Sequence, residues 1–227
     1  MKKLILVSLL LFSILTMSAQ TSNNKYENEW KDVEQIEAQS LPQSAIKIVD
    51  DILQKAINDK NSTQVIKALI YKNKYKKDID RQDNEGLIKD IQALVLQTND
   101  IAEKSLLSSM LAELYWNFYS SNQWQINQRT KLIDLVPDDM KEWSSNVFVD
   151  KIVGSLNQSL NDVERLKAHT TKGYDDIILL GTDGQKYYPT LYDFLAYRAL
   201  YISKNIWRIG GEGFDTATTG VSLEKLI

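Results

Sequence analysis

Residues 101–119 read IAEKSLLSSMLAELYWNFY, and they form the strongest structural pattern in this chain. Apolar residues recur here at steps of three and four, which places them on one side of an α-helix. They are Ala102, Leu106, Leu107, Met110, Leu111, Leu114, Tyr115, Phe118 and Tyr119. The pattern predicts a long amphipathic helix whose apolar side packs on other helices.

The same periodicity continues on both sides of this segment. Toward the N-terminus it predicts four helices. The first carries Tyr26, Trp30, Val33 and Ile36, and the second covers 43–58. The third follows a cap at Asn61 or Ser62 and bears Val65, Ile66, Leu69 and Ile70, and the fourth is a shorter helix over 87–96. Toward the C-terminus it predicts one long helix over 147–166. A last helix opens at Thr190 and Asp193, which have the spacing of a capping box.

Glycine placement organises the rest of the chain. No glycine precedes Gly86, and four of the nine lie in the last eighteen residues. We therefore expect a mostly α protein built of antiparallel helical hairpins, either tetratricopeptide-like or an irregular solenoid or bundle. The expected parts are a helical domain over 20–168, a terminal helix and a small β-hairpin or ordered loop near 176–188 within 169–205, and an irregular tail over 206–227.

The first residues have the features of an export signal. Lys2 and Lys3 precede an apolar run from Leu4 to Met17, and Ala19 offers a small residue before a cleavage site. The run is shorter than the roughly twenty residues that span a bilayer, so a permanent anchor is the less favoured alternative. We expect a signal peptide over 1–19, a mature chain without a transmembrane segment, and export to the periplasm, the cell envelope or the medium.

Composition excludes several classes of function. The net charge of −3 becomes −5 without Lys2 and Lys3, whereas nucleic-acid binding needs a concentrated basic surface. The chain has no cysteine and a single histidine, His169, which argues against thiolate zinc sites, Cys nucleophiles and multi-His metal sites. We expect a protein that is not an enzyme and that holds no metal or cofactor.

Four aromatic residues are the candidates for partner contact: Tyr115, Trp116, Tyr119 and Trp124. With Phe118 they could form a platform for peptides or sugars. The favoured interpretation is that the cluster belongs to the core, because burial of each ring contributes roughly 1.5 to 3 kcal/mol.

Polar clusters have a structural interpretation beside a functional one. We expect Glu113 to form an inter-helix hydrogen bond or ion pair, with a catalytic acid as the alternative. Three acid pairs are expected to be helix-face, cap or turn residues: Asp50/Asp51, Asp138/Asp139 and Asp175/Asp176. One group over 67–77 is expected to be a solvated helix face, with a polyanion patch as the alternative: Lys67, Tyr71, Lys72, Lys74, Tyr75, Lys76 and Lys77.

Several longer strings carry a family resemblance. They are LPQSAIKIVDDIL from Leu41, VIKALIYK from Val65, LLSSMLAELYWNFY from Leu106 and PTLYDFLAYRAL from Pro189. Together with the signal peptide, they resemble the N-terminal region of the alpha-2-macroglobulin-like proteins of Bacteroidetes over about residues 1–205. The resemblance implies an exported envelope protein related to protease traps, with a helical segment ahead of β-sandwich domains. Those domains are absent here, so the chain looks truncated, either as a short paralogue or as an interrupted gene.

Three classes of function follow. The leading hypothesis is a non-catalytic scaffolding or docking module of such a macroglobulin-like protein, whose partners are the missing downstream domains or other envelope proteins. It predicts an exposed apolar face. The alternative is a free-standing periplasmic tetratricopeptide-like adaptor that binds peptides or envelope proteins in a polar groove. A hydrolase is the third, and it would need a buried carboxylate pair in a cleft.

Overall fold

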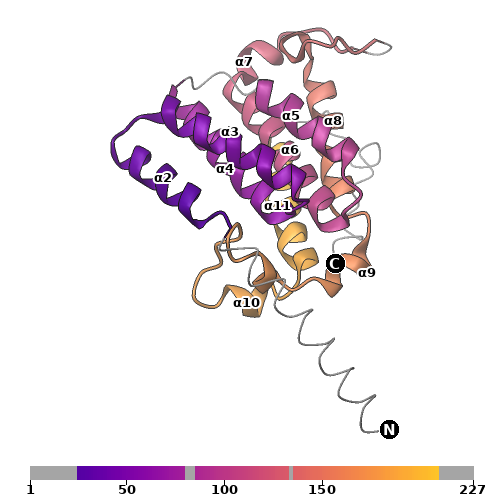
Figure 1. Ribbon diagram of the computed structural model, residues 1–227. Helices are drawn as coiled ribbons and strands as arrows, with labels where there is room; N and C mark the ends of the chain where they lie inside the picture. The colour runs from indigo at the N-terminus through magenta and orange to yellow at the C-terminus, as the bar shows by residue number, and fades with distance from the viewer. Residues whose placement is uncertain (1–24, 80–84, 133–134, 210–227) are drawn as a thin grey trace, which may run out of the picture. The chain divides into compact units, whose positions relative to one another are not determined.

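The computed structural model describes residues 25–79, 85–132 and 135–209, and these are mostly α-helical (Figure 1). Helices pack against one another as hairpins, which confirms the predicted fold class. The chain divides into two compact units with a boundary after Ile79. We call residues 25–79 unit 1 and residues 85–209 unit 2. The boundary falls inside the range 20–168, which the continuous helical pattern had assigned to one domain.

Unit 1 consists, in its described part, of α2 (Glu27–Ala38), α3 (Pro42–Asn58) and α4 (Ser62–Ile79). Pro42 occupies the first turn of α3, where its fixed φ suits a helix and its missing N–H is not needed. Asn61 caps α4, because its Oδ1 accepts a hydrogen bond of 3.2 Å from the backbone N–H of Gln64. The predicted hairpin over 43–58 and the following helix is therefore confirmed.

The ends of α2 and α3 share an unusual feature. Ser40 and Lys60 follow the two helices with φ of 57° and 54°, in the left-handed region. The N–H groups of Ser40 and Leu41 bond back to the carbonyls of Glu37 and Ile36, as in a Schellman motif. This region favours glycine, so two side-chain-bearing residues hold the turns of unit 1 at some conformational cost.

The core of unit 1 is made from one stripe on each helix. Its buried apolar residues are Trp30 and Val33 from α2, Ala45, Val49, Ile52, Leu53 and Ala56 from α3, and Val65, Ile66, Ala68, Leu69 and Tyr75 from α4. The stripe predicted over 43–58 is buried apart from its two edge residues, Ile46 and Ile57, which are half-buried.

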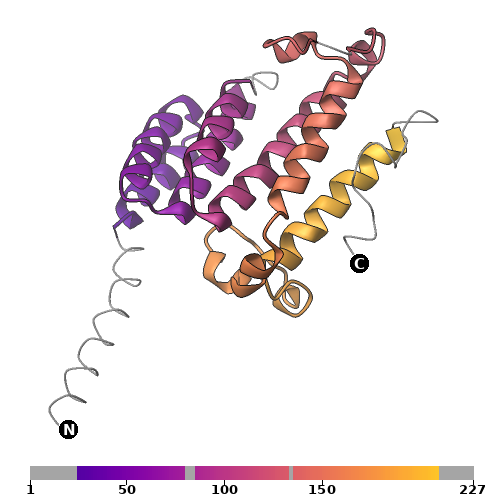
Figure 2. The same cartoon turned by 90° about the vertical axis from the view of Figure 1, so that its right-hand side faces the viewer.

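Unit 2 contains the two longest of the described helices, α6 and α11, and α6 is its central one. Its elements are α5 (Glu85–Gln97), α6 (Ile101–Ser121), α7 (Gln123–Ile126), η1 (Met140–Glu142), α8 (Ser145–Ser159), α9 (Val163–Ala168), η2 (Thr171–Tyr174), α10 (Gly184–Tyr187) and α11 (Leu191–Ile209). α6 packs on α5, α8 and α11, and Figure 2 shows α11 beside α8 at one edge of this unit. The side chain of Asp100 caps α6 by accepting from the N–H of Glu103 at 2.7 Å.

The burial of α6 is wider than a one-sided stripe. Ser105, Ser108 and Ser109 are buried together with the predicted apolar residues, whereas Met110 is only half-buried. The reason is that three helices surround α6, so small polar residues also face neighbours. Sequence periodicity finds the apolar stripe but not the number of partners.

One predicted helix is wrong in length. The segment 147–166 is two helices, because α8 ends at Ser159 and α9 begins at Val163. Asp162 accepts a hydrogen bond of 3.3 Å from the backbone N–H of Arg165 and so caps a new helix. The apolar spacing continues across the break, which is why the pattern suggested one helix.

The segment near 176–188 is an ordered loop and not a β-hairpin. It contains the short α10, and the β-type pairing nearby within the described residues is an isolated antiparallel bridge between Thr170 and Thr190. The N–H of Leu191 donates to the carbonyl of His169 at 2.8 Å, which closes the base of the loop. A Cβ at Gly184 would lie 2.4 Å from the Cβ of Leu180, so this position needs glycine.

The capping box that opens the last helix is confirmed. Asp193 Oδ2 accepts from the N–H and the hydroxyl of Thr190, at 3.0 and 2.6 Å, and Thr190 Oγ1 accepts from the N–H of Asp193 at 3.3 Å. α11 continues to Ile209, so residues 206–209, which were predicted to begin an irregular tail, are helical. The predicted signal peptide and residues 210–227 lie outside the described residues. No described helix combines the length and hydropathy of a membrane-spanning segment.

Candidate functional site

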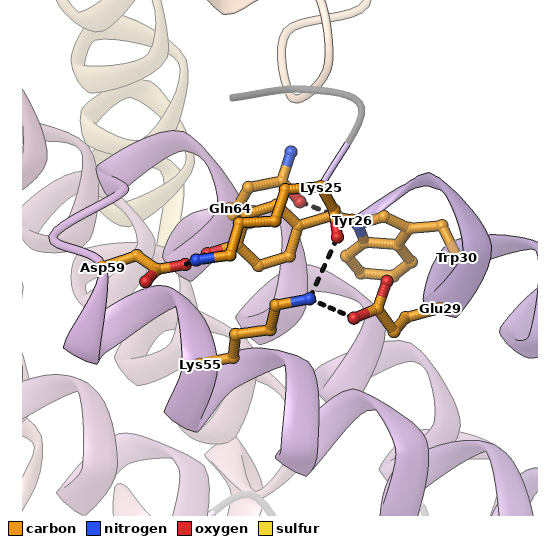
Figure 3. Close-up of polar contacts among 7 residues, drawn as sticks. All are labelled: Lys25, Tyr26, Glu29, Trp30, Lys55, Asp59 and Gln64. Atoms are coloured by element: carbon orange, nitrogen blue, oxygen red, sulfur yellow. Dashed lines mark hydrogen bonds and ion pairs between the residues drawn. The ribbon is translucent and has the colours of Figure 1, made fainter. Parts of the chain in front are cut away.

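A polar network at the start of α2 brings together titratable side chains of unit 1 (Figure 3). Asp59 at the end of α3 accepts hydrogen bonds from the Lys25 ammonium and the Tyr26 hydroxyl, both at 2.6 Å. Lys55 forms an ion pair with Glu29 and donates to the carbonyl of Lys25 at 2.9 Å. These contacts fix the first turn of α2 against α3.

Trp30 ties α2 to α4 in the same region. Its indole N–H donates to the side-chain oxygen of Gln64 at 2.7 Å, and both residues are buried (Figure 3). The Lys67 ammonium lies 4.5 Å from the centre of the indole ring, and Tyr71 packs on the same ring. The indole therefore contributes both packing and a satisfied hydrogen bond.

The electrostatics of this network follow from its pairing. Burial, followed by the bond to Asp59, raises the pKa of Tyr26, so its hydroxyl stays protonated. The hydrogen bond from Lys25, and then that from Tyr26, lowers the pKa of Asp59. The hydrogen bond from Lys55 lowers the pKa of Glu29. Acids and bases are thus paired with each other, which suits a structural clamp better than acid–base catalysis.

The lysine–tyrosine group on α4 is also paired within unit 1. Lys74 forms an ion pair with Glu37 of α2, and the Tyr75 hydroxyl donates to the same carboxylate at 2.5 Å. Lys72 pairs with Asp50 of α3 at 2.8 Å. Because Lys72 and Lys74 have carboxylate partners, these two cations are not unpaired charges of a polyanion patch or of a solvated face. The contacts of Lys74 and Tyr75 with Glu37 form the second clamp, which holds α2 on the hairpin.

The fold places the four aromatic candidates in different environments. Tyr115 and Tyr119 are buried, with rings 5.8 Å from those of Trp143 and Phe148 respectively. Burial raises the pKa of Tyr115 to about 12, and its hydroxyl accepts a hydrogen bond from Gln92. Phe118 also stacks on Phe148 at 5.6 Å. The interpretation as core is confirmed for the two tyrosines, which therefore offer no contact surface.

The two tryptophans of the candidate set lie differently. Trp116 is half-buried, and its ring lies 6.1 Å from that of Tyr119. Trp124, on the short α7, is 76 % exposed. The four residues do not form one platform, because they do not share one exposed face.

Glu113 has the inter-helix role expected for it. Its carboxylate lies 2.6 Å from the Arg198 guanidinium of α11, and the same guanidinium donates to Ser109 at 2.9 Å. Arg198 also lies over the ring of Phe194. This set of contacts orients α11 on α6.

Two of the remaining polar candidates, Asp139 and His169, have local structural partners. Asp139 caps η1 by accepting from the N–H of Lys141 at 2.8 Å, as expected for a cap residue. His169 lies after α9 with its Nδ1 3.2 Å from the Tyr174 hydroxyl. In the described part of the chain, no three or more His, Asp or Glu side chains come together as a metal site.

We take the outer side of α11 as the candidate partner-binding surface, because it exposes large apolar side chains. We call Asp193, Tyr197, Leu200, Tyr201 and Lys204 the α11 face. Tyr197, Leu200 and Tyr201 are 51 %, 44 % and 62 % exposed, and Tyr188 extends the face by packing its ring on Tyr197 at 4.9 Å. The opposite side of the helix is buried on unit 2 through Leu191, Leu195, Ala199, Ile202 and Ile206.

This face was not singled out from the sequence. The available signal was that α11 has two apolar stripes. At 100 degrees per residue, Tyr197, Leu200 and Tyr201 lie about 100 to 160 degrees away from Leu195 and Ile202 around the helix axis. A helix at the edge of a unit needs only one such stripe.

Comparison with protein-family models, curated proteins and solved structures finds no match.

Proposed function

We propose that this chain is a non-catalytic helical docking module of an exported envelope protein, of the macroglobulin-like kind that its sequence resembles. The observation that carries the proposal is the α11 face. Exposed apolar side chains are ordinary when they are scattered, but three of them on one helix side form a contiguous surface. Such a surface gains free energy when a partner protein covers it.

Residue type supports a protein partner for this surface. Tyrosine is enriched at protein interfaces because it buries a large rigid ring at little entropic cost and keeps a hydroxyl for hydrogen bonding. Asp193 and Lys204 form the two ends of the face, which gives polar ends to an apolar centre. The ion pair between Arg198 and Glu113 at the edge of the buried side ties α11 to α6, so the face is presented on a fixed support.

The pairing of charged groups in the other polar clusters supports the same proposal. The titratable groups of unit 1 form two clamps, and Glu113 is paired with Arg198. None of these arrangements places an unpaired base beside a nucleophile. The exposed apolar side chains of the α11 face contribute little to the stability of unit 2, and a docking role explains their presence.

Site-specific photo-crosslinking in the envelope of the native organism tests the proposal. A benzoylphenylalanine replaces Tyr201 of the α11 face in one variant and Glu34, on the exposed outer side of α2, in the control. We expect a discrete protein adduct from position 201 that is absent from position 34, and its loss when Tyr197→Ser and Leu200→Ser are added. Equal labelling from both positions would overturn the proposal.

A further inference from the structure

The α11 face has the spacing of a coiled-coil seam. Asp193, Tyr197, Leu200 and Lys204 follow one another at steps of four, three and four residues, which is the period of positions that meet a second helix. Tyr201 lies directly beside the seam. Over these residues the seam is about 16 Å long, at 1.5 Å per residue.

The order of residue types along this seam is self-complementary. In an antiparallel pair of identical helices, the numbers of two residues that face each other always add up to the same sum. With a sum of 397, Tyr197 faces Leu200 of the second copy, and Asp193 faces Lys204 of the second copy. The apolar residues thus meet at the centre, and opposite charges meet at both ends.

A parallel pair of the same helices would be penalised. It would place Asp193 against Asp193 and Lys204 against Lys204, and like charges in contact oppose association. The capping box does not prevent the antiparallel pairing, because both bonds from Thr190 go to Oδ2 of Asp193. The second carboxylate oxygen is not needed for the cap.

We infer that the occupant of the α11 face is a second copy of this chain, bound antiparallel through α11. The inference rests on the proposed docking role of this face and specifies the partner. Because the seam is short and involves one helix from each copy, the interface is small, and we expect reversible dimerisation with a dissociation constant of the order of micromolar.

Sedimentation of residues 20–227 over about 1 to 100 µM tests the inference. We expect a concentration-dependent monomer–dimer equilibrium. Leu200→Lys should weaken dimerisation at least about tenfold, whereas Leu96→Lys, at an exposed leucine of α5, should leave it unchanged. Lys204→Glu should also weaken it, and Lys89→Glu on α5 serves as the matched charge control.

The orientation has its own readout because the chain contains no cysteine. A mixture of the Tyr197→Cys and Leu200→Cys variants should form a disulfide between them, since an antiparallel pair brings these positions within bonding distance. Lys204→Cys should not crosslink to itself, because its two copies would lie about 16 Å apart along the axis. A Lys204→Cys homodimer would overturn the antiparallel arrangement.

The result separates this inference from the proposed function. A chain that stays monomeric at all concentrations, but crosslinks from position 201 to a different protein, refutes the second copy and keeps the docking role. A monomeric chain without any specific adduct refutes both. A dimer that Leu200→Lys does not weaken places the contact elsewhere and refutes the inference.

Discussion

Helices α2 and α11 are both amphipathic, yet their outer sides differ in kind. The outer side of α2 carries Glu27, Lys31, Asp32, Glu34 and Gln35, which are all exposed and suited to water. The outer side of α11 carries Tyr197, Leu200 and Tyr201. An amphipathic helix with one apolar stripe is explained by its own unit, whereas a second apolar stripe needs an explanation from outside it.

The inner sides of the two helices differ as well. α2 is attached by charged and aromatic clamps at Asp59, Glu37 and Gln64. α11 is attached mainly by buried aliphatic residues, with the Arg198–Glu113 ion pair at the edge. The comparison indicates that α2 is held by specific polar geometry and α11 by hydrophobic burial, so the two respond to different perturbations.

The largest effect is expected on the inner side of α11. Leu195→Ala removes a completely buried side chain and should destabilise unit 2 by about 2 to 5 kcal/mol. Leu200→Ala makes the same chemical change on the outer side and should alter monomer stability by no more than about 0.5 kcal/mol. Denaturant unfolding at a concentration that keeps the chain monomeric measures both. Similar losses for the two variants would remove the distinction between the sides.

The next effect is expected where α2 meets α4. Gln64→Leu leaves the buried indole N–H of Trp30 without its acceptor and should cost about 1 to 3 kcal/mol. Hydrogen exchange of the α2 and α4 amides measures the loss locally. The double variant Trp30→Phe with Gln64→Leu should lose less than the sum of the two single variants. Strict additivity would show that the two side chains are not coupled.

Acidic pH should weaken the attachment of α2 to the rest of unit 1. The pKa values of Glu29, Glu37 and Asp59 are lowered chiefly by hydrogen bonds from Lys55, Lys74 and Lys25, so the folded-state values lie below the unfolded ones. The stability from these pairs is therefore fully present only above the unfolded-state pKa values of roughly 3.9 to 4.3, from about pH 5 upward, and is lost as the pH falls through the folded-state values.

Amide exchange of α2 between pH 7 and pH 3, corrected for intrinsic rates, measures this loss. The matched variant combines Glu37→Gln with Asp59→Asn, and its α2 should show a flatter pH dependence. An unchanged slope in that variant would mean that other carboxylates control the docking of α2.

The smallest effect is expected at the turn that ends α2. Ser40→Gly should stabilise unit 1 by about 1 kcal/mol, because Ser40 has a left-handed φ that glycine adopts without strain. Ser44→Gly, at an exposed position inside α3, should instead destabilise by a few tenths of a kcal/mol. Thermal unfolding of the two variants gives the comparison, and a loss in both would argue against the left-handed turn.

Periodicity predicted most of the helices because burial requires it. The stripes over 43–58 and 101–119, the cap at Asn61 and the capping box at Thr190 and Asp193 all depend on residues close in sequence, and all are present. The break at Asp162 was missed because the apolar spacing continues through it. The α11 face was not predicted, because packing decides which apolar stripe of the helix stays exposed, whereas Tyr115 and Tyr119 were favoured as core residues and are buried.

The sequence by itself determined the helical class, the local caps and the apolar stripes, because these follow from interactions within about one helical turn. Tertiary structure decided which stripe of α11 is buried and which is exposed. It also decided that Lys72 and Lys74 are paired with carboxylates and are not part of an unpaired basic surface. The physical reason is that burial and ion pairing depend on neighbours distant in sequence, such as Glu113 and Arg198, which no local pattern brings together.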